Sequence, residues 1–336
     1  MRKKQRFSMT TKFIIIMVIV AILVTCLIIG YFSIADLIAN ISDTETEVID
    51  SLQVVQGFLL VVIFLNISFI IILGIMQYDL YNKIKESEYF AKINNLMTMV
   101  DQQKSMEGLE IYNDRLVKAI GSFAAHVKEP KKVYSALYNI YLLKSMKTEA
   151  DFEKIKMYIT ILMKAYAENY NLQEVYTDRK IAKIAEAAAF YDIGKLGTPG
   201  HILYKESNLN EYDYKLAKEH AEVGFNIVEA IKPDIEMGTF EQYFRDIAGF
   251  HHERFDGTGY PRGLKGEEIP FIARIVALVT TYDTVTRDRP YSKAMSHLDA
   301  VALINEEKNN YFDPKIVKVF NSVENEFNKI HDRKEL

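Results

Sequence analysis

Two long apolar segments near the N-terminus constrain this 336-residue chain more than any other feature. Residues 13–32 and 58–76 contain no charged side chain. A helix of about 20 residues spans the ~30 Å hydrocarbon layer of a membrane, so each segment is long enough to cross it once. The second segment has only two polar side chains, Asn66 and Ser68, and hydrogen bonds across a helix pair can satisfy both. The sequence therefore predicts a membrane anchor with two transmembrane helices within residues 1–77.

The charges that flank these segments predict their orientation. Basic residues precede the first segment and follow the second, whereas residues 33–57 carry acidic side chains and no Lys or Arg. The flanking basic residues are Arg2, Lys3, Lys4, Arg6, Lys12, Lys83 and Lys85, and the acidic ones are Asp36, Asp43, Glu45, Glu47 and Asp50. The positive-inside rule places both termini in the cytoplasm and a short acidic loop outside. The first segment is too long for a cleaved signal peptide, and no A-x-A-like site follows it.

The rest of the chain is predicted to be helical throughout, which makes the expected fold class all-α. Alternating strand-type patterns are nearly absent, and apolar residues recur at the three-to-four spacing of amphipathic helices. The segments with this periodicity are 133–146, 152–170, 178–191, 211–231, 241–251, 272–286 and 297–308. We expect these segments to form a helical bundle domain over 140–325.

A connector is predicted between the anchor and this domain, over residues 78–139. Its first part is polar, with apolar positions at helical spacing that include Ile93, Leu96 and Val100. Gln102, Gln103 and Lys104 interrupt this stripe, so a long coiled coil is not expected. We therefore expect a helical connector, with a homodimer as the open alternative.

Composition excludes several functions. The net charge of −4 is too close to zero for a chain that coats a nucleic-acid polymer. The single cysteine, Cys26, excludes a disulfide framework and a CxxC-type zinc site. Chemistry is therefore expected from His and Asp side chains near the two Gly-rich loops, 194–200 and 256–263.

Four residues are candidates for metal ligands. His251 and His252 are adjacent, near a predicted helix end and a Gly-rich loop, and adjacent imidazoles on a helix point about 100° apart. His220 alone is more typical of a surface histidine. Asp192 precedes Gly194 and Lys195, a pattern in which the carboxylate can bind a cation while the lysine binds a phosphate, although a turn-capping role fits equally.

Five segments, taken in their order along the chain, resemble the HD-GYP family, a branch of the HD superfamily of metal-dependent phosphohydrolases. The segments are YDIGKLGTP at 191–199, KEHAEVG at 218–224, HHERFDGTGYP at 251–261, IPFIARIVAL at 269–278 and YDTVTRDRPY at 282–291. The resemblance covers roughly residues 140–320. It implies an all-α bundle around a two- or three-metal centre, and hydrolysis of the bacterial second messenger cyclic di-GMP to pGpG or GMP.

The resemblance also implies residue roles. Asp192, His220, His251 and His252 fall on metal-ligand positions of the family, with Fe or Mn as the expected divalent metal. Asp192 and Lys195 would be catalytic, Lys195 by neutralising phosphate oxygens. The loop residues Arg254, Asp256, Gly257, Gly259, Tyr260 and Pro261 would shape the surface that contacts the substrate or a partner such as a GGDEF-type protein. The expected location is the bacterial inner membrane.

Three expected ligands are absent from this sequence. Tyr191 stands where the family has the His of its His-Asp pair, and Thr280 replaces the first Asp of a D-x-x-D pair that ends at Asp283. An upstream His expected near residue 155 is Ile155, and Asp151 or Glu153 is a conceivable replacement. Four ligands are enough for one ion and hardly enough for two.

The ligand count leaves three functional hypotheses. The first is a membrane-anchored cyclic di-GMP phosphodiesterase with a reduced site that holds one metal ion. The second is a catalytically silent HD-GYP domain that binds a nucleotide or a protein partner and holds no metal. The third is a one-metal phosphohydrolase that acts on another nucleotide.

Overall fold

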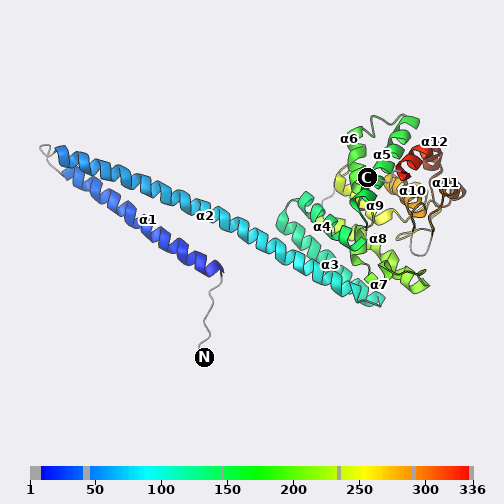
Figure 1. Cartoon of the computed structure of the whole chain (residues 1–336), viewed down its shortest axis with the longest axis horizontal. Coiled ribbons are helices and arrows are strands. Elements are labelled where there is room, and N and C mark those ends of the chain that lie inside the picture. The colour runs from blue at the N-terminus through cyan, green and yellow to red at the C-terminus, as the bar shows by residue number, and fades with distance from the viewer. Residues whose placement is uncertain (1–8, 41–45, 146, 233–235, 289–292, 333–336) are drawn as a thin grey trace, which may run out of the picture. The chain divides into compact units, whose positions relative to one another are not determined.

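The computed structural model describes residues 9–40, 46–145, 147–232, 236–288 and 293–332. Within these ranges the chain is helical with no β-strand, which confirms the all-α prediction. It divides into two compact units, residues 1–85 and 86–336 (Figure 1). The basic residues Arg2, Lys3, Lys4 and Arg6 lie outside the described residues. The acidic residues Asp43 and Glu45, and the end of the 282–291 segment, also lie outside them.

The first unit contains α1 (Met9–Asn40) and the first part of α2 (Thr46–Asp101). Both helices are long and apolar enough to cross a membrane, by length and composition. Large apolar side chains such as Phe32, Phe58 and Phe64 are more than 60% exposed along them. The expected loop of residues 33–57 is helical at both ends, because α1 continues to Asn40 and α2 begins at Thr46.

The second unit contains the end of α2 and all later helices. The longer ones are α3 (Met106–Val127), α4 (Pro130–Ser145), α5 (Glu149–Asn169), α6 (Asp178–Ala188), α8 (Glu211–Ile231), α9 (Phe240–Phe250), α10 (Phe271–Val285), α11 (His297–Glu306) and α12 (Pro314–His331). Short turns of helix are α7 (Gly200–Leu203) and the 3₁₀ helices η1 (Ile193–Gly197) and η2 (Gly266–Glu268).

The helices begin where the sequence supplies a capping side chain. The Thr148 hydroxyl accepts from the Asp151 backbone N–H, and Asp151 accepts in return from the Thr148 N–H, so the two form a capping box at α5. Asn210 caps α8 through its side-chain oxygen, which accepts from the Asp213 backbone N–H. These caps satisfy N–H groups that have no partner within the helix.

The predicted helical segments correspond to α4, α5, α6, α8, α9, α10 and α11, with ends that differ by a few residues. Sequence reasoning missed α12. Its N-terminal signal is nevertheless present, because Asp313 caps the helix by accepting from the Lys315 N–H and Pro314 occupies the first turn.

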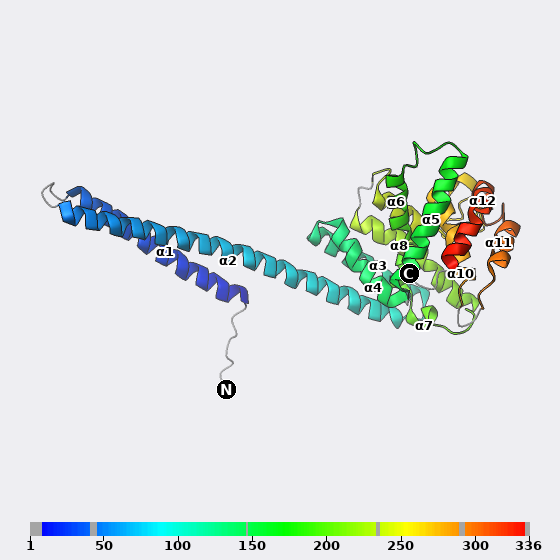
Figure 2. The ribbon, with the colours of Figure 1, turned by 45° about the horizontal axis from the view of Figure 1, so that its top comes forward.

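The core of the second unit lies around α5. This helix packs against α6, α10 and α12 (Figure 2). Helix α8 packs against α3, α9 and η1. Tyr158 of α5 stacks on Phe327 of α12 with ring centroids 4.6 Å apart, and both rings are fully buried. Each buried aromatic ring contributes about 2 kcal/mol of transfer free energy, so this contact is a strong constraint on the position of α12.

Part of the predicted connector belongs to this core. Ile93, Leu96 and Val100 are buried, with Ile93 and Leu96 in the main apolar cluster. Leu116 and Ile120 of α3 are fully buried in the same cluster. The apolar stripe that we considered for dimerisation therefore packs within its own chain. A boundary near residue 140 stays a prediction.

A buried lysine joins three elements near η1. Lys144 of α4 donates to the Asp101 carboxylate at the end of α2 (3.0 Å) and to the backbone carbonyl of Leu196 in η1 (2.9 Å). Asp101 also accepts from the Gly200 N–H at 3.1 Å. Burial lowers the pKa of Lys144, and the neighbouring Asp101 opposes that shift. The hydrogen bonds of Lys144 and Asp101 therefore hold η1 and Gly200, which follow Asp192 in the chain, against α4 and the end of α2.

Replacing this lysine is expected to loosen η1. Lys144→Met leaves the Leu196 carbonyl without its donor, which costs about 1–3 kcal/mol. Hydrogen exchange of the amides of residues 193–200, measured by mass spectrometry on the full chain in detergent, should accelerate by roughly 5–150-fold. Lys118→Met is the control, because Lys118 forms an exposed pair with Asp114. Equal exchange in the two variants would contradict the role of Lys144.

Candidate metal centre

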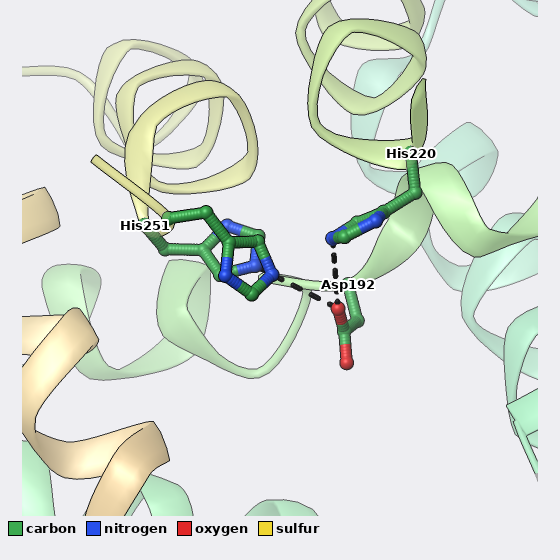
Figure 3. A group of neighbouring side chains, drawn as sticks. Asp192, His220 and His251 are labelled. Carbon is green, nitrogen blue, oxygen red and sulfur yellow. Dashed lines mark ion pairs between the residues drawn. The ribbon is translucent and has the colours of Figure 1, made fainter. Parts of the chain in front are cut away.

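Four side chains of the metal-ligating types converge in the second unit. Asp192, His220, His251 and His252 each offer one ligand atom, and these atoms lie within 4.8 Å of one another. Figure 3 shows the side chains of Asp192, His220 and His251 pointing toward one another from different elements. The structure thus brings together the four residues that the sequence singled out. Their role as ligands stays a prediction.

Close backbone packing holds Asp192 against the helix that carries His220. Asp192 is the residue before η1, and His220 lies in α8. A Cβ atom at Gly194 would overlap the His220 carbonyl oxygen and lie 2.5 Å from the Gly224 nitrogen. Only glycine allows this approach, so the GKLG turn is part of the site geometry.

Hydrogen bonds fix the tautomers of two imidazoles. The Nδ1–H of His220 donates to the Ala217 carbonyl at 2.6 Å, and the Nδ1–H of His251 donates to the Ile247 carbonyl at 2.9 Å. A carbonyl can only accept, so the proton of each neutral ring is on Nδ1. The Nε2 atoms then carry lone pairs, as in metal-bound histidines that donate to a backbone carbonyl.

Three buried acceptor atoms meet with no donor between them. The Nε2 atoms of His220 and His251 lie 3.4 and 3.6 Å from Oδ1 of Asp192. Among the described residues none of these three atoms has a hydrogen-bond partner. Ligands around one divalent ion at about 2.1 Å are separated by roughly 3–4 Å, so the spacing fits an ion. This donor set matches one divalent cation.

Electrostatics keep the ligands in the states that bind metal. Burial lowers the pKa of His220 to about 4, although the neighbouring Asp192 opposes the shift. Burial and the neighbouring imidazole of His251 place the pKa of His252 well below its usual range. Burial alone would raise the pKa of Asp192, but Lys195 and the surrounding groups hold it well below the ordinary value. At neutral pH His220 and His252 are therefore neutral imidazoles, and Asp192 is a carboxylate.

The second oxygen of Asp192 has a different environment. Its Oδ2 accepts from Lys195 Nζ at 2.6 Å, and Lys147 Nζ lies 3.9 Å away. Lys147 also contacts Tyr191, both through the phenol oxygen and with its ammonium 4.3 Å from the ring centre. Burial lowers the pKa of Lys147 to about 8, while Asp192 opposes the shift. Lys147 therefore remains mostly protonated at neutral pH.

At three positions the family resemblance implies a metal ligand and this chain has another residue. The side chains at these positions make other contacts. The Thr280 hydroxyl donates to the Val276 carbonyl of its own helix at 2.8 Å. Ile155 is 1% exposed and lies in the apolar core. Tyr191 is buried and lies beside His251, with ring centroids 5.3 Å apart. None of these three side chains adds a ligand to the cluster.

The nearby carboxylates are also engaged. Asp283 accepts from Arg287 with both oxygens at 3.0 Å, and Arg287 pairs with Asp151 at 2.7 Å. Glu153 pairs with Lys156 at 2.6 Å on the surface. Asp151 and Glu153, which we considered as replacements for the missing histidine, are therefore not in the cluster of four ligands.

The Gly-rich loop is attached to the site through Glu253. The Glu253 carboxylate accepts from the backbone N–H groups of Arg262 (2.7 Å) and Leu264 (3.0 Å). Tyr260 stacks on His252 with centroids 4.6 Å apart and planes at 18°. A Cβ at Gly259 would overlap the backbone of Glu253 and Arg254, so glycine is required there as well.

The remaining predicted loop residues have structural roles. The Asp256 carboxylate accepts from the backbone and hydroxyl of Thr258, at 2.8 and 2.7 Å. Gly257 has a φ of +87°, which favours glycine, and Pro261 follows Tyr260 through a cis peptide bond. Arg254 lies over the ring of Tyr311, 3.7 Å from its centre.

A cavity of about 350 Å³ opens beside the four ligands. Positive side chains on its wall are Lys147, Lys195 and Arg254, and the ligands on it are Asp192, His251 and His252. Tyr191 and Thr280 line it too. A cavity with three cations beside a metal-ligand cluster is suited to a phosphate-containing ligand.

Sequence reasoning missed three residues of this site. Glu253 stands between the recognised His252 and the loop. Arg287 lies four residues after Asp283, the spacing of a helical ion pair, and this signal was available. Lys147 gives no local signal, because it reaches Asp192 only through the packing of distant segments.

Fold and site together define a helical domain with a cluster of three histidines and one aspartate that could hold a metal ion, and the comparisons with known proteins agree with this class of fold. The HD domain family matches residues 132–316, more than half of the chain. The chain is 33% identical over 180 residues to a cyclic di-GMP phosphodiesterase of Vibrio cholerae, covering 54% of this chain and 37% of the relative. It is 34% identical over 168 residues to a cyclic di-GMP phosphodiesterase of Thermotoga maritima, covering 50% and 43%.

A third relative has a different named substrate. It is a 3′3′-cGAMP-specific phosphodiesterase of Vibrio cholerae, 30% identical over 202 residues, covering 59% of this chain and 41% of the relative. In all three cases the chain spans less than half of the relative's length. The chain belongs to the HD domain family and, within it, to the HD-GYP branch.

The close approach at Gly194 gives a prediction for metal binding. Gly194→Ala should push η1 from α8 and lower bound Mn²⁺ by at least about tenfold, because ligand geometry is lost. Equilibrium dialysis of the full chain in detergent measures this. Gly108→Ala is the control, since its Cβ would meet only side-chain atoms of Gln103 and Ser105 and the added methyl group favours a helix. Normal Mn²⁺ binding by Gly194→Ala would exclude the proposed packing role.

Proposed function

We propose that this chain is a membrane-anchored HD-GYP-type phosphodiesterase that hydrolyses cyclic di-GMP or a related cyclic dinucleotide with one divalent ion. The observation that carries the proposal is the set of three orphaned acceptors, on Asp192, His220 and His251, beside a cavity with cationic walls. The named activities of the relatives support the substrate class.

The residues have complementary roles in this reaction. Asp192, His220, His251 and His252 would hold the ion, which when bound supplies Lewis-acid polarisation and lowers the pKa of a coordinated water molecule. Lys195, 33% exposed at the side chain, reaches the cavity while it pairs with Asp192 and would neutralise phosphate oxygens. Arg254 lines the same cavity and would contribute a second phosphate contact. Fe or Mn is the metal we expect.

A second candidate function follows from Tyr191, Ile155 and Thr280, which stand where the resemblance implies metal ligands and add none to the cluster. If the remaining ligands are too few for turnover, the domain would bind a cyclic dinucleotide without hydrolysing it. It would then signal through the Gly-rich loop to a partner such as a GGDEF-type protein. The loop residues Asp256, Gly257 and Thr258 lie at the surface and are available for such a contact. A homodimer also stays a prediction.

Hydrolysis distinguishes the two functions. The full chain in detergent with Mn²⁺ should convert cyclic di-GMP or 3′3′-cGAMP to a linear dinucleotide. Chromatography of the reaction mixture measures this product. His251→Ala should reduce kcat/KM by at least about 100-fold, because a ligand is lost, and EDTA should have the same effect. His201→Ala is the control, since His201 is exposed on α7.

The same assay can overturn the phosphodiesterase proposal. Binding of a cyclic dinucleotide without any linear product would favour the silent module. Turnover of other nucleotides alone would favour a phosphohydrolase of different specificity. Product formation that is unaffected by His251→Ala would exclude the proposed metal centre as the reaction site.

We further propose that α1 and the apolar part of α2 cross the bacterial inner membrane with both termini in the cytoplasm. Their length, composition and exposed apolar side chains support this, because exposed Phe and Ile surfaces of this extent are unfavourable in water. The distribution of basic and acidic flanking residues supports the orientation.

Cysteine labelling tests this topology. In a Cys26→Ser background, Asp50→Cys should react with a membrane-impermeant maleimide on intact cells, because residue 50 is expected outside. Lys118→Cys should react only after permeabilisation, since it lies on the exposed surface of the second unit. Labelling of Lys118→Cys alone on intact cells would contradict the orientation, and labelling of both positions or of neither would contradict the membrane crossing.

A further inference from the structure

The two oxygens of Asp192 face opposite kinds of partner. Oδ1 faces the Nε2 lone pairs of His220 and His251 at 3.4 and 3.6 Å. A cation bound between these three acceptor atoms would be stabilised by all of them. Oδ2 already has cations, with Lys195 at 2.6 Å and Lys147 at 3.9 Å. A carboxylate that bridges two metal ions with one oxygen on each ion needs both oxygens available. Here only one side of the carboxylate is available to a metal.

Lys147 is held in this place by several contacts. Its ammonium contacts the Tyr191 hydroxyl and lies 4.3 Å from the centre of the same ring. The Phe152 ring lies 5.8 Å from it on another side. The side chain is 18% exposed and lines the cavity beside the ligands. These contacts position a fixed positive charge, in contrast to a mobile surface lysine.

Among the described residues, the side chains on the wall around Lys147 are engaged in other contacts. Tyr191 is in contact with the lysine itself, and the Thr280 hydroxyl donates to the Val276 carbonyl. Asp283, the nearest carboxylate along that helix, is bound by Arg287 through both oxygens. The residues present therefore do not fit a second metal ion on this side of Asp192.

We propose that Lys147 is a built-in cation that occupies the side of Asp192 where a second metal ion would bind, so that the centre accepts one divalent ion only. The ammonium supplies one positive charge at Oδ2, and with Lys195 it leaves no free carboxylate oxygen on that side. This inference rests on the one-ion site of the proposed function and assigns Lys147 as a residue that sets metal stoichiometry.

Metal counting tests this inference without an activity assay. The full chain in detergent is stripped with a chelator and dialysed against excess MnCl₂, and bound Mn²⁺ is measured by elemental analysis. Electron paramagnetic resonance then shows whether two ions are coupled, as expected for ions about 4 Å apart. The wild-type chain should bind one Mn²⁺ and give the spectrum of an isolated ion.

Variants that add ligand groups make the test specific for Lys147. Tyr191→His with Thr280→Asp places two metal-ligating groups on the cavity wall, and this double variant should still bind one Mn²⁺. Adding Lys147→Ala should raise the count to two with a coupled spectrum. Adding Lys156→Ala instead is the matched control and should leave one ion, because Lys156 pairs with Glu153 away from the cluster.

The outcomes separate this inference from the proposed function. Two ions in the wild-type chain or in the double variant would overturn the role of Lys147, and so would a single ion after Lys147→Ala is added. The first two counts remain decisive even if the triple variant does not fold. No Mn²⁺ in the folded wild-type chain would overturn the metal centre itself, and the proposed function with it.

Discussion

The buried carboxylate of Asp192 is the interaction on which the site depends. A carboxylate with 2% exposure is costly to bury unless cations or donors surround it. Lys195 of η1 supplies a cation to one oxygen, while the other oxygen faces the imidazoles of His251, at the end of α9, and His220, in α8. Lys147, just before α5, adds a fourth direction. The helical bundle can therefore be understood as the framework that brings these groups to one carboxylate.

Local sequence patterns predicted most of the helices because their causes are local. The segment 211–231 coincides with α8, which has a capping Asn210 and apolar residues at helical spacing. The assignment of residues 78–139 depended on a non-local fact. The stripe of Ile93, Leu96 and Val100 looks alike whether it faces a second chain or its own domain. Only the packing of the described residues distinguishes these possibilities, and it places the stripe inside the second unit.

The four ligand candidates were accessible from sequence because a resemblance linked short motifs that lie far apart in the chain. Asp192, His220 and the pair His251 and His252 meet as expected. The cationic side of the centre was not accessible. Lys147 and Tyr191 are 44 residues apart, and nothing in either local sequence indicates the contact. The absent ligands at Tyr191 and Thr280 were visible in the sequence, but what replaces them becomes visible only in three dimensions.

The hydrogen bonds of the two imidazoles have a consequence for how this centre can change during evolution. His220 and His251 are each oriented by a backbone carbonyl of the preceding helical turn, Ala217 and Ile247. A side-chain acceptor can be lost by one codon change, whereas a backbone carbonyl is present whatever residue occupies the position. The orientation of each imidazole therefore depends on the helical backbone and not on the identity of a neighbouring side chain. Substitution at Ala217 or Ile247 leaves these carbonyl acceptors in place, so a chain that loses other candidate ligands can retain these two in the same orientation.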